Sequence, residues 1–203
     1  MPSIASRSRS SRLSRRRDGL DITSEASVAA ALGALDGDYD LIITATGALK
    51  IGETGPEKAL RQLDESYLVA QFAINAIGPA LILKHALRLL PRDRRAVFAA
   101  LSARVGSIGD NRLGGWYGYR ASKAALNQFL HGAAIEVARS HPHAVLAALH
   151  PGTVATPFTR GFVKPENAVP PQAAAKNLLN VLEGLDAARS GGFFDYAGRE
   201  IPW

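Results

Sequence analysis

Three neighbouring stretches decide the fold: AVFAAL at residues 96–101, YRASKAALNQFLHGAAIEVAR at residues 119–139 and AVLAAL at residues 144–149. The first and the third are short apolar runs, which is typical of strands buried on both faces of a parallel sheet. The long segment between them is predicted to be a helix. A strand, a helix and a second strand in this order form a βαβ unit, so these residues predict an α/β fold with a parallel sheet.

The alternation of helix and strand continues on either side of this unit. The other predicted helical segments are residues 24–35, 56–63, 66–90 and 171–185, and the other predicted strands are residues 39–44 and 192–196. Ligands of parallel α/β sheets bind at the carboxyl ends of the strands. We therefore expect site residues in the segments that follow Thr44, Leu101 and Leu149.

The composition excludes several classes of protein. A chain of 203 residues with 47% hydrophobic residues suits one domain with a substantial core. It has no cysteine, so a disulfide framework, a thiolate metal site and a cysteine nucleophile are all excluded. No run of 18 apolar residues occurs, so no membrane span is expected, and the start lacks the apolar region of a secretory signal.

The net charge of +6 comes from residues 1–17, which hold six arginines, six serines and no acidic residue. This stretch predicts a flexible tail, and residues 18–203 are expected to form a single domain. A transit peptide and a nucleic-acid-binding arm are alternative interpretations of the tail. Because the rest of the chain is electrically balanced, no nucleic-acid partner is expected.

Tyr119 and Lys123 lie four residues apart at the start of a predicted helix, so their side chains share one face. A nearby ammonium favours the tyrosinate and is expected to lower the pKa of the tyrosine from its usual ~10. Such a tyrosine is a usable general acid and base. The spacing alone is also common on helix surfaces, so the surrounding residues decide its meaning.

Those surroundings are rich in glycine and in polar residues at strand ends. Ser102 ends a predicted strand, and Gly106, Gly109, Gly114 and Gly115 lie in the loop between it and Tyr119. Asn75 lies inside an apolar helix, either as a satisfied core amide or as an anchor for a water or a lysine. HPGTVAT at residues 150–156 is either an ordinary Pro-Gly turn or a ligand clamp. The histidines show no metal-binding spacing, so no metal is expected.

Taken together, these motifs resemble the short-chain dehydrogenase/reductase family. The stretch GSIGDNRLGGWYGYRASKAALN (residues 106–127) and the ending FDYAGREIPW (residues 194–203) are similar to its C-factor-like, or sniffer-like, subgroup. The resemblance covers residues 18–203. It implies a Rossmann-like, doubly wound parallel sheet with helices on both faces and a cytoplasmic, NAD(P)-dependent oxidoreductase that reduces a carbonyl or oxidises an alcohol.

The resemblance also implies roles for individual residues. Tyr119 is expected to donate a proton to the carbonyl, Lys123 to lower its pKa and to bind the nicotinamide ribose, and Asn75 to hold a relay water. Ser102 is the expected substitute for the family's catalytic serine. Besides Tyr119 and Lys123, the residues expected to bind the cofactor are Asp21, Thr46, Gly47, Pro151, Gly152, Val154 and Thr156.

The sequence departs from the family pattern at its start. The family opens with a strand, a Gly-x-x-x-Gly-x-Gly turn, a helix and a second strand, but only twenty residues precede Asp21. We therefore expect the first strand and the Gly-rich turn to be missing, the chain to be an N-terminally truncated form, and the strand at 39–44 to have an unpaired edge. Residues 13–17 (LSRRR) look like the end of the family's second strand, where arginine suits the 2′-phosphate of NADP(H), so NADP(H) is expected over NAD(H).

Two further departures lie at the site. Ala103 occupies the position of the usual catalytic serine, with Ser102 and Ser107 as possible replacements. Thr44-Ala45-Thr46-Gly47 replaces the usual Asn-Asn-Ala-Gly, although the glycine is kept. These departures support an alternative in which the chain is a non-catalytic or truncated member that acts as a C-factor-like signalling or scaffold protein.

The resemblance has two more implications. A homodimer or homotetramer is expected to form through the long helices at 66–90 and 119–139. The substrate pocket is expected to be lined by Trp116, Tyr117 and the segment after Thr156. Phe158 and Phe162 lie in that segment, whose Gly and Pro residues are typical of a mobile lid.

Overall fold

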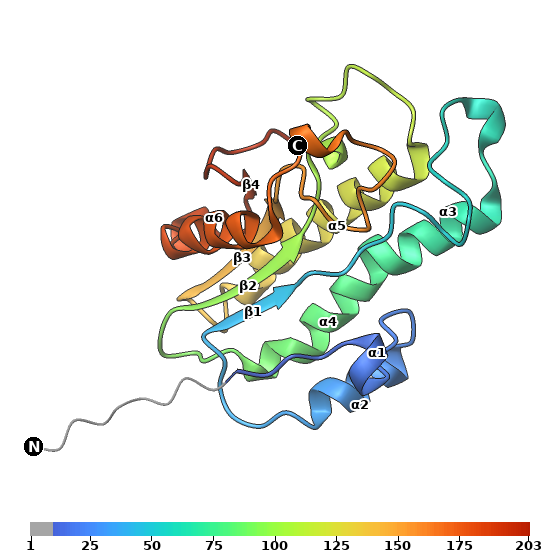
Figure 1. Cartoon of the computed structure of the whole chain (residues 1–203). Helices are drawn as coiled ribbons and strands as arrows, with labels where there is room; N and C mark the ends of the chain where they lie inside the picture. The colour runs from blue at the N-terminus through green and yellow to red at the C-terminus, as the bar shows by residue number, and fades with distance from the viewer. Residues whose placement is uncertain (1–9) are drawn as a thin grey trace, which may run out of the picture.

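The computed structural model describes residues 10–203 and contains a parallel sheet between layers of helices (Figure 1). The strands are β1 (Leu41–Thr44), β2 (Ala96–Leu101), β3 (Ala144–His150) and β4 (Phe193–Asp195). They lie in the order β1-β2-β3-β4, and every neighbouring pair is parallel. The predicted α/β class is therefore confirmed, and each predicted strand lies within two residues of its observed bounds.

Six α-helices connect and flank the strands in the described part of the chain. They are α1 (Arg15–Asp18), α2 (Glu25–Gly33), α3 (Glu65–Phe72), α4 (Gly78–Ala86), α5 (Tyr117–Val137) and α6 (Pro171–Glu183). Short 3₁₀ turns lie at Leu60–Gln62, Leu87–Leu89, Arg104–Gly106, Pro165–Asn167 and Ala187–Arg189. The predicted helical turn within 56–63 is thus a single 3₁₀ turn.

The long helix predicted at 66–90 is a continuous run of different helical types. A π-helical segment, Ala73–Ile77, joins α3 to α4, and a 3₁₀ turn ends the run at Leu89. Pro79, in the first turn of α4, has no N–H to donate to the preceding turn, and this interrupts the regular α-helical pattern. The widened segment contains Asn75, and π-bulges are frequent at functional sites.

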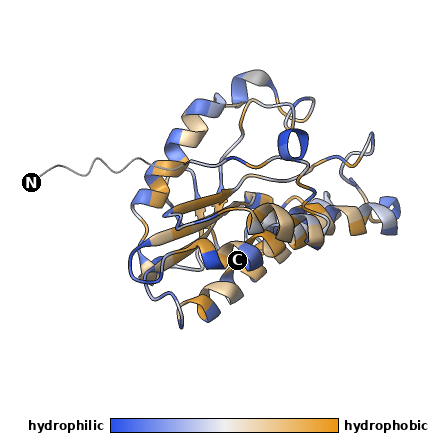
Figure 2. Ribbon diagram, turned by 90° about the horizontal axis from the view of Figure 1, so that it is seen from below, coloured by the Kyte–Doolittle hydropathy of each residue, from blue (hydrophilic) through white to orange (hydrophobic). Residues whose placement is uncertain are grey.

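The two faces of the sheet are covered by different helices because successive strand residues point to opposite sides. On one face, Phe98 and Leu146 pack with α4 and α5. On the other, Val97 and Val145 pack with Leu178 of α6. Figure 2 shows the hydrophobic colouring concentrated in the strands and in the helices beside them. This arrangement confirms the doubly wound sheet with helices on both faces.

The edge of β1 that faces away from β2 is unpaired within residues 10–203. Leu41 and Ile43 of this strand are 39% and 42% exposed, which is unusual for such apolar side chains in a parallel sheet. The prediction of an unpaired edge is therefore confirmed for the described residues.

The end of the predicted tail contains a helical turn. Residues 1–9 lie outside the described part of the chain. Further on, α1 forms within the predicted tail because Ser14 accepts a hydrogen bond from the N–H of Arg17 and Gly19 ends the turn at φ +67°. Leu13 packs against the core. This helical turn stands in place of the strand end suggested by residues 13–17.

One helical run bears on the expectation that no segment spans a membrane. The run Glu65–Leu89 is long and apolar enough, by length and composition, to cross a membrane. Within the fold, however, it lies against α2 and α5 (Figure 1), and its Gln71 and Asn75 hydrogen-bond inside the protein. These are the contacts of a core helix. A core helix can be as long and as apolar as a membrane-spanning helix, so length and composition alone do not distinguish the two.

Candidate active site

Tyr119 and Lys123 lie one turn apart near the start of α5. They are 5% and 2% exposed, and the ammonium nitrogen of Lys123 lies 6.0 Å from the centroid of the Tyr119 ring. The helix places both residues on its buried face, as the spacing predicts. Their position is also close to the carboxyl end of β2, because Lys123 Nζ donates to the carbonyl of Leu101 at 2.8 Å.

Burial dominates the protonation of both groups. It raises the pKa of Tyr119 and lowers that of Lys123 to about 8. The predicted lowering of the tyrosine pKa is therefore wrong for this structure. The physical reason is that burial away from water favours the neutral form of each group. This effect outweighs the attraction between a tyrosinate and the ammonium of Lys123, which is directed at the carbonyl of Leu101.

Asn75 binds the loop that follows β1. Its Oδ1 accepts from the N–H of Ala48 at 2.8 Å, and its Nδ2 donates to the carbonyl of Ala48 at 2.9 Å and to Gln71 Oε1. The amide is thus satisfied within the protein, as in the core-amide interpretation. Gln71 was not singled out from the sequence, although its spacing of four residues from Asn75 on an apolar helix is a signal that could have identified it.

Gly47 lies between Asn75 and Lys123. A Cβ atom at this position would be 3.2 Å from Asn75 Oδ1 and 3.4 Å from Lys123 Nζ. The chain therefore comes close to both side chains only because residue 47 has none. The structure brings together the predicted residues Gly47, Asn75, Tyr119 and Lys123 from three separate parts of the sequence.

The two candidate serines are both buried and engaged. Ser102 donates its hydroxyl proton to Asn127 Oδ1 at 2.6 Å. Ser107 donates to the carbonyl of Pro202 and accepts from the N–H of Asp110. Neither hydroxyl proton is free for a substrate carbonyl, so this geometry does not support the role predicted for Ser102. Asn127 was missed because its partner lies 25 residues away.

We expect Ser102→Ala to leave the turnover number for carbonyl reduction within about threefold of the parent. It should lower the free energy of unfolding by about 1 kcal/mol, since one buried hydrogen bond is lost. Steady-state kinetics and urea unfolding measure the two effects. A loss of about 10²–10³ in turnover would instead identify Ser102 as the carbonyl-polarising group. Ala103→Ser, which restores a hydroxyl at the family's usual position, is the matched variant.

The predicted nicotinamide-binding loop starts where β3 ends. Pro151, Gly152 and Thr153 line a hollow together with Arg104 and Tyr196. Burial lowers the pKa of the neighbouring His150 to about 4, so this imidazole is neutral at pH 7. Further along the loop, Val154 pairs with Val169, and the N–H of Thr156 donates to Thr159 at 3.3 Å.

The segment after Thr156 folds back across Tyr119. The ring of Phe158 lies 6.2 Å from that of Tyr119, and the ring of Phe162 lies 5.8 Å from that of Trp116. Phe158 also comes within 4.0 Å of where a Cβ of Gly47 would be. These aromatic side chains therefore border the predicted site.

Asp21 and Thr46 differ in their surroundings. Asp21 is bound within its own segment, where its carboxylate accepts from Thr23 and lies 3.9 Å from Arg15. The structure therefore does not bring Asp21 into contact with the Tyr119 cluster. The buried hydroxyls of Thr46 and Thr44 have no hydrogen-bond partner among residues 10–203. Together with Lys123 close to Gly47, these unpaired hydroxyls fit a polar ligand such as a nucleotide ribose.

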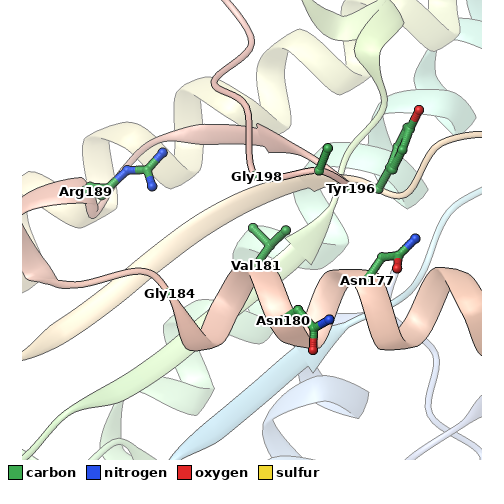
Figure 3. A pocket seen from close by; sticks show the side chains of 8 residues that line it. Asn177, Asn180, Val181, Gly184, Arg189, Tyr196 and Gly198 are labelled. Atoms are coloured by element: carbon green, nitrogen blue, oxygen red, sulfur yellow. The ribbon is translucent and has the colours of Figure 1, made fainter.

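A second hollow lies between α6 and the turn after β4. Asn177, Asn180 and Val181 of the helix line it together with Tyr196 and Gly198 of the turn (Figure 3). It contains none of the residues predicted from the sequence to bind a ligand. We therefore place the candidate active site at Tyr119 and Lys123 and not in this hollow.

Comparisons with known proteins identify the family of this chain. The family model for enoyl-(acyl carrier protein) reductase matches residues 10–189. The C-signal of Myxococcus xanthus is 33% identical over 168 residues, which cover 82% of this chain and 94% of that protein. The 1-hydroxy-2-glutathionyl-2-methyl-3-butene dehydrogenase of Rhodococcus sp. is 32% identical over 188 residues, covering 91% of this chain and 79% of that enzyme.

The fold has a solved relative as well. A short-chain dehydrogenase/reductase from Burkholderia multivorans, crystallised with bound NADP, superimposes with a TM-score of 0.76 at 26% identity and covers 91% of this chain and 75% of that one. The chain therefore belongs to the short-chain dehydrogenase/reductase family, and within it to the C-factor-like type.

Proposed function

We propose that this chain is an NADP(H)-dependent oxidoreductase that reduces a carbonyl compound, or oxidises the corresponding alcohol, with Tyr119 as general acid and base. The observation that carries the proposal is the burial of Tyr119 and Lys123 one helical turn apart beside Gly47 and Asn75. Family membership and the dehydrogenase from Rhodococcus support the reaction class.

The residues around Gly47 fit the nicotinamide-ribose half of the cofactor. Lys123 and the unpaired hydroxyl of Thr46 are suited to the ribose, and the Pro151–Gly152 turn is suited to the nicotinamide. When bound, a reduced nicotinamide supplies the hydride. Tyr119 holds the proton that the carbonyl oxygen takes up, and its high pKa keeps it protonated at neutral pH. Phe158 lies against the tyrosine ring.

The preference for NADP(H) is part of the proposal. Its support is the run Arg15–Arg17, since guanidinium groups pair with a 2′-phosphate, and the NADP bound to the relative from Burkholderia. Val154 and Thr156 complete the proposed nicotinamide loop, and Asp21 is proposed for the adenine end. We further propose that the chain self-associates through the long helices, whose exposed apolar residues include Val69, Ile77, Phe129 and Ile135. We also propose a cytoplasmic location.

A nucleotide titration tests the proposal. The purified chain should bind NADPH saturably, and about tenfold more tightly than NADH, as followed by nucleotide fluorescence. Gly47→Val should abolish binding because its side chain would collide with Asn75 and Lys123. Gly33→Ala, at a position with open space around it, is the matched control and should bind as the parent does. A folded parent chain that binds neither nucleotide would contradict the proposal.

The second candidate function is a non-catalytic signalling or scaffold role like the one that the name C-signal indicates. The observation that favours it is the match to the C-signal itself, which is 33% identical over 94% of that protein. Turnover of NADPH with a carbonyl substrate separates the candidates, because only the oxidoreductase consumes the nucleotide.

A further inference from the structure

The first turn of α5 receives a buried carboxylate from a distant loop. Glu57, in the loop between β1 and α3, is 5% exposed, and both of its carboxylate oxygens lie 3.2 Å from the backbone nitrogen of Gly118. Its backbone carbonyl also accepts a hydrogen bond from the N–H of Trp116. A single residue thus binds the turn that leads into α5 at two points.

The local sequence provides no cap for this helix. Trp116, at the N-cap position, makes no side-chain hydrogen bond and has φ +52°, and Gly114 and Gly115 before it both have φ +64°. The first N–H groups of a helix lack intrahelical partners, and the helix N-terminus carries partial positive charge. The carboxylate of Glu57 satisfies one of these groups and complements that charge.

The contact is closely fitted and directly precedes the reactive tyrosine. A Cβ atom at Gly118 would lie 2.9 Å from Glu57 Oε1 and 3.0 Å from Leu68 Cδ2. Tyr119 is the next residue, and its ring packs edge-on against Trp116 with 6.3 Å between centroids. The position of the Tyr119 hydroxyl therefore depends on the first turn of α5, and Glu57 holds that turn from the loop between β1 and α3.

We propose that Glu57 is a positioning residue, which fixes the first turn of α5 and thereby the place of Tyr119 relative to Lys123. The proposal rests on the proposed function, since Tyr119 is the reactive group of that reaction. Displacing a reacting group by about 1 Å can cost about 10²-fold in rate. Glu57 touches neither substrate nor cofactor in this account, so its effect should fall on turnover and not on nucleotide affinity.

The first test needs no turnover. Hydrogen exchange at the Gly118 amide, followed by NMR in the whole chain, reports directly on the contact. Glu57→Leu should accelerate this exchange at least tenfold, because the acceptor is lost. Glu57→Gln keeps an acceptor of the same size and should stay within about threefold of the parent. Glu53→Leu, which removes an exposed carboxylate from the same loop, is the matched control and should change nothing.

The second test measures NADPH-dependent reduction of a carbonyl substrate by the same variants. Glu57→Leu should lower kcat about 10²-fold, with the KM and the nucleotide Kd within about threefold of the parent. Glu57→Gln should restore most of kcat. Equal loss of kcat and nucleotide affinity in Glu57→Leu would overturn the proposal, because it would indicate general damage to the fold. Unchanged exchange and kcat would overturn it as well.

Glu57→Asp keeps the test decisive if Glu57→Leu does not fold. It retains the charge but withdraws the carboxylate by one methylene, so the folded protein should show faster Gly118 exchange and a lower kcat. Parent-like values would overturn the proposal. If the parent itself has no turnover while Glu57→Leu still accelerates the exchange, the structural contact stands and the proposed function has failed.

Discussion

Tyr119→Phe should reduce the turnover of a carbonyl substrate by about 10²–10⁴-fold, the usual range for removal of a general acid. The change deletes only the hydroxyl, and the buried ring keeps its packing against Trp116 and Phe158. The nucleotide affinity should therefore stay within about threefold of the parent, and the melting temperature should stay within a few degrees. Steady-state kinetics, nucleotide fluorescence and thermal unfolding measure these three quantities.

Tyr39→Phe is the matched control for this prediction. It removes a phenolic hydroxyl that bonds Ser11, just before the amino end of β1, whereas the site lies at the carboxyl ends of the strands. Its turnover should equal that of the parent. If Tyr119→Phe retained more than about a tenth of the parental turnover, another group would have to supply the proton, and the assignment of Tyr119 would be wrong.

Between pH 7 and pH 9.5, the free energy of unfolding should rise by about 2 kcal/mol because of Lys123 alone. Burial lowers the pKa of this lysine from 10.5 to about 8 in the folded protein. Over this window the folded state releases the proton while the unfolded chain still holds it, so raising the pH favours the folded state. Urea unfolding at 25 °C at several pH values measures the rise.

Lys123→Met should show no such rise, since it has no proton to release. Lys176→Met, which removes an exposed lysine from α6, should keep the parental slope. The window ends below pH 10 because burial raises the pKa of Tyr119 and Tyr67, which oppose the effect at higher pH. If the parent and Lys123→Met showed the same dependence on pH, the buried ammonium would not be the cause.

Much of the fold could be predicted from local sequence. The strand at Ala96–Leu101 was predicted with its observed bounds, because a strand buried on both faces is a continuous apolar run between polar residues. The helix α5 was predicted from Tyr119, two residues after its observed start at Tyr117, because residues spaced like Tyr119 and Lys123 share one face of a helix. The π-helical segment was not predicted, because the expected helix was treated as uniform in spite of Pro79.

For the site, the sequence by itself determined which chemical groups are present: a tyrosine and a lysine one turn apart, a helical asparagine and a glycine after a strand. The tertiary structure alone decided what each group contacts. It placed the hydroxyl of Ser102 on Asn127, covered Tyr119 so that burial raises its pKa, and brought Glu57 to a helix 61 residues away. The physical reason is that helical and strand periodicity depends on neighbouring residues, whereas burial and hydrogen bonding depend on which distant loops the folded chain brings together.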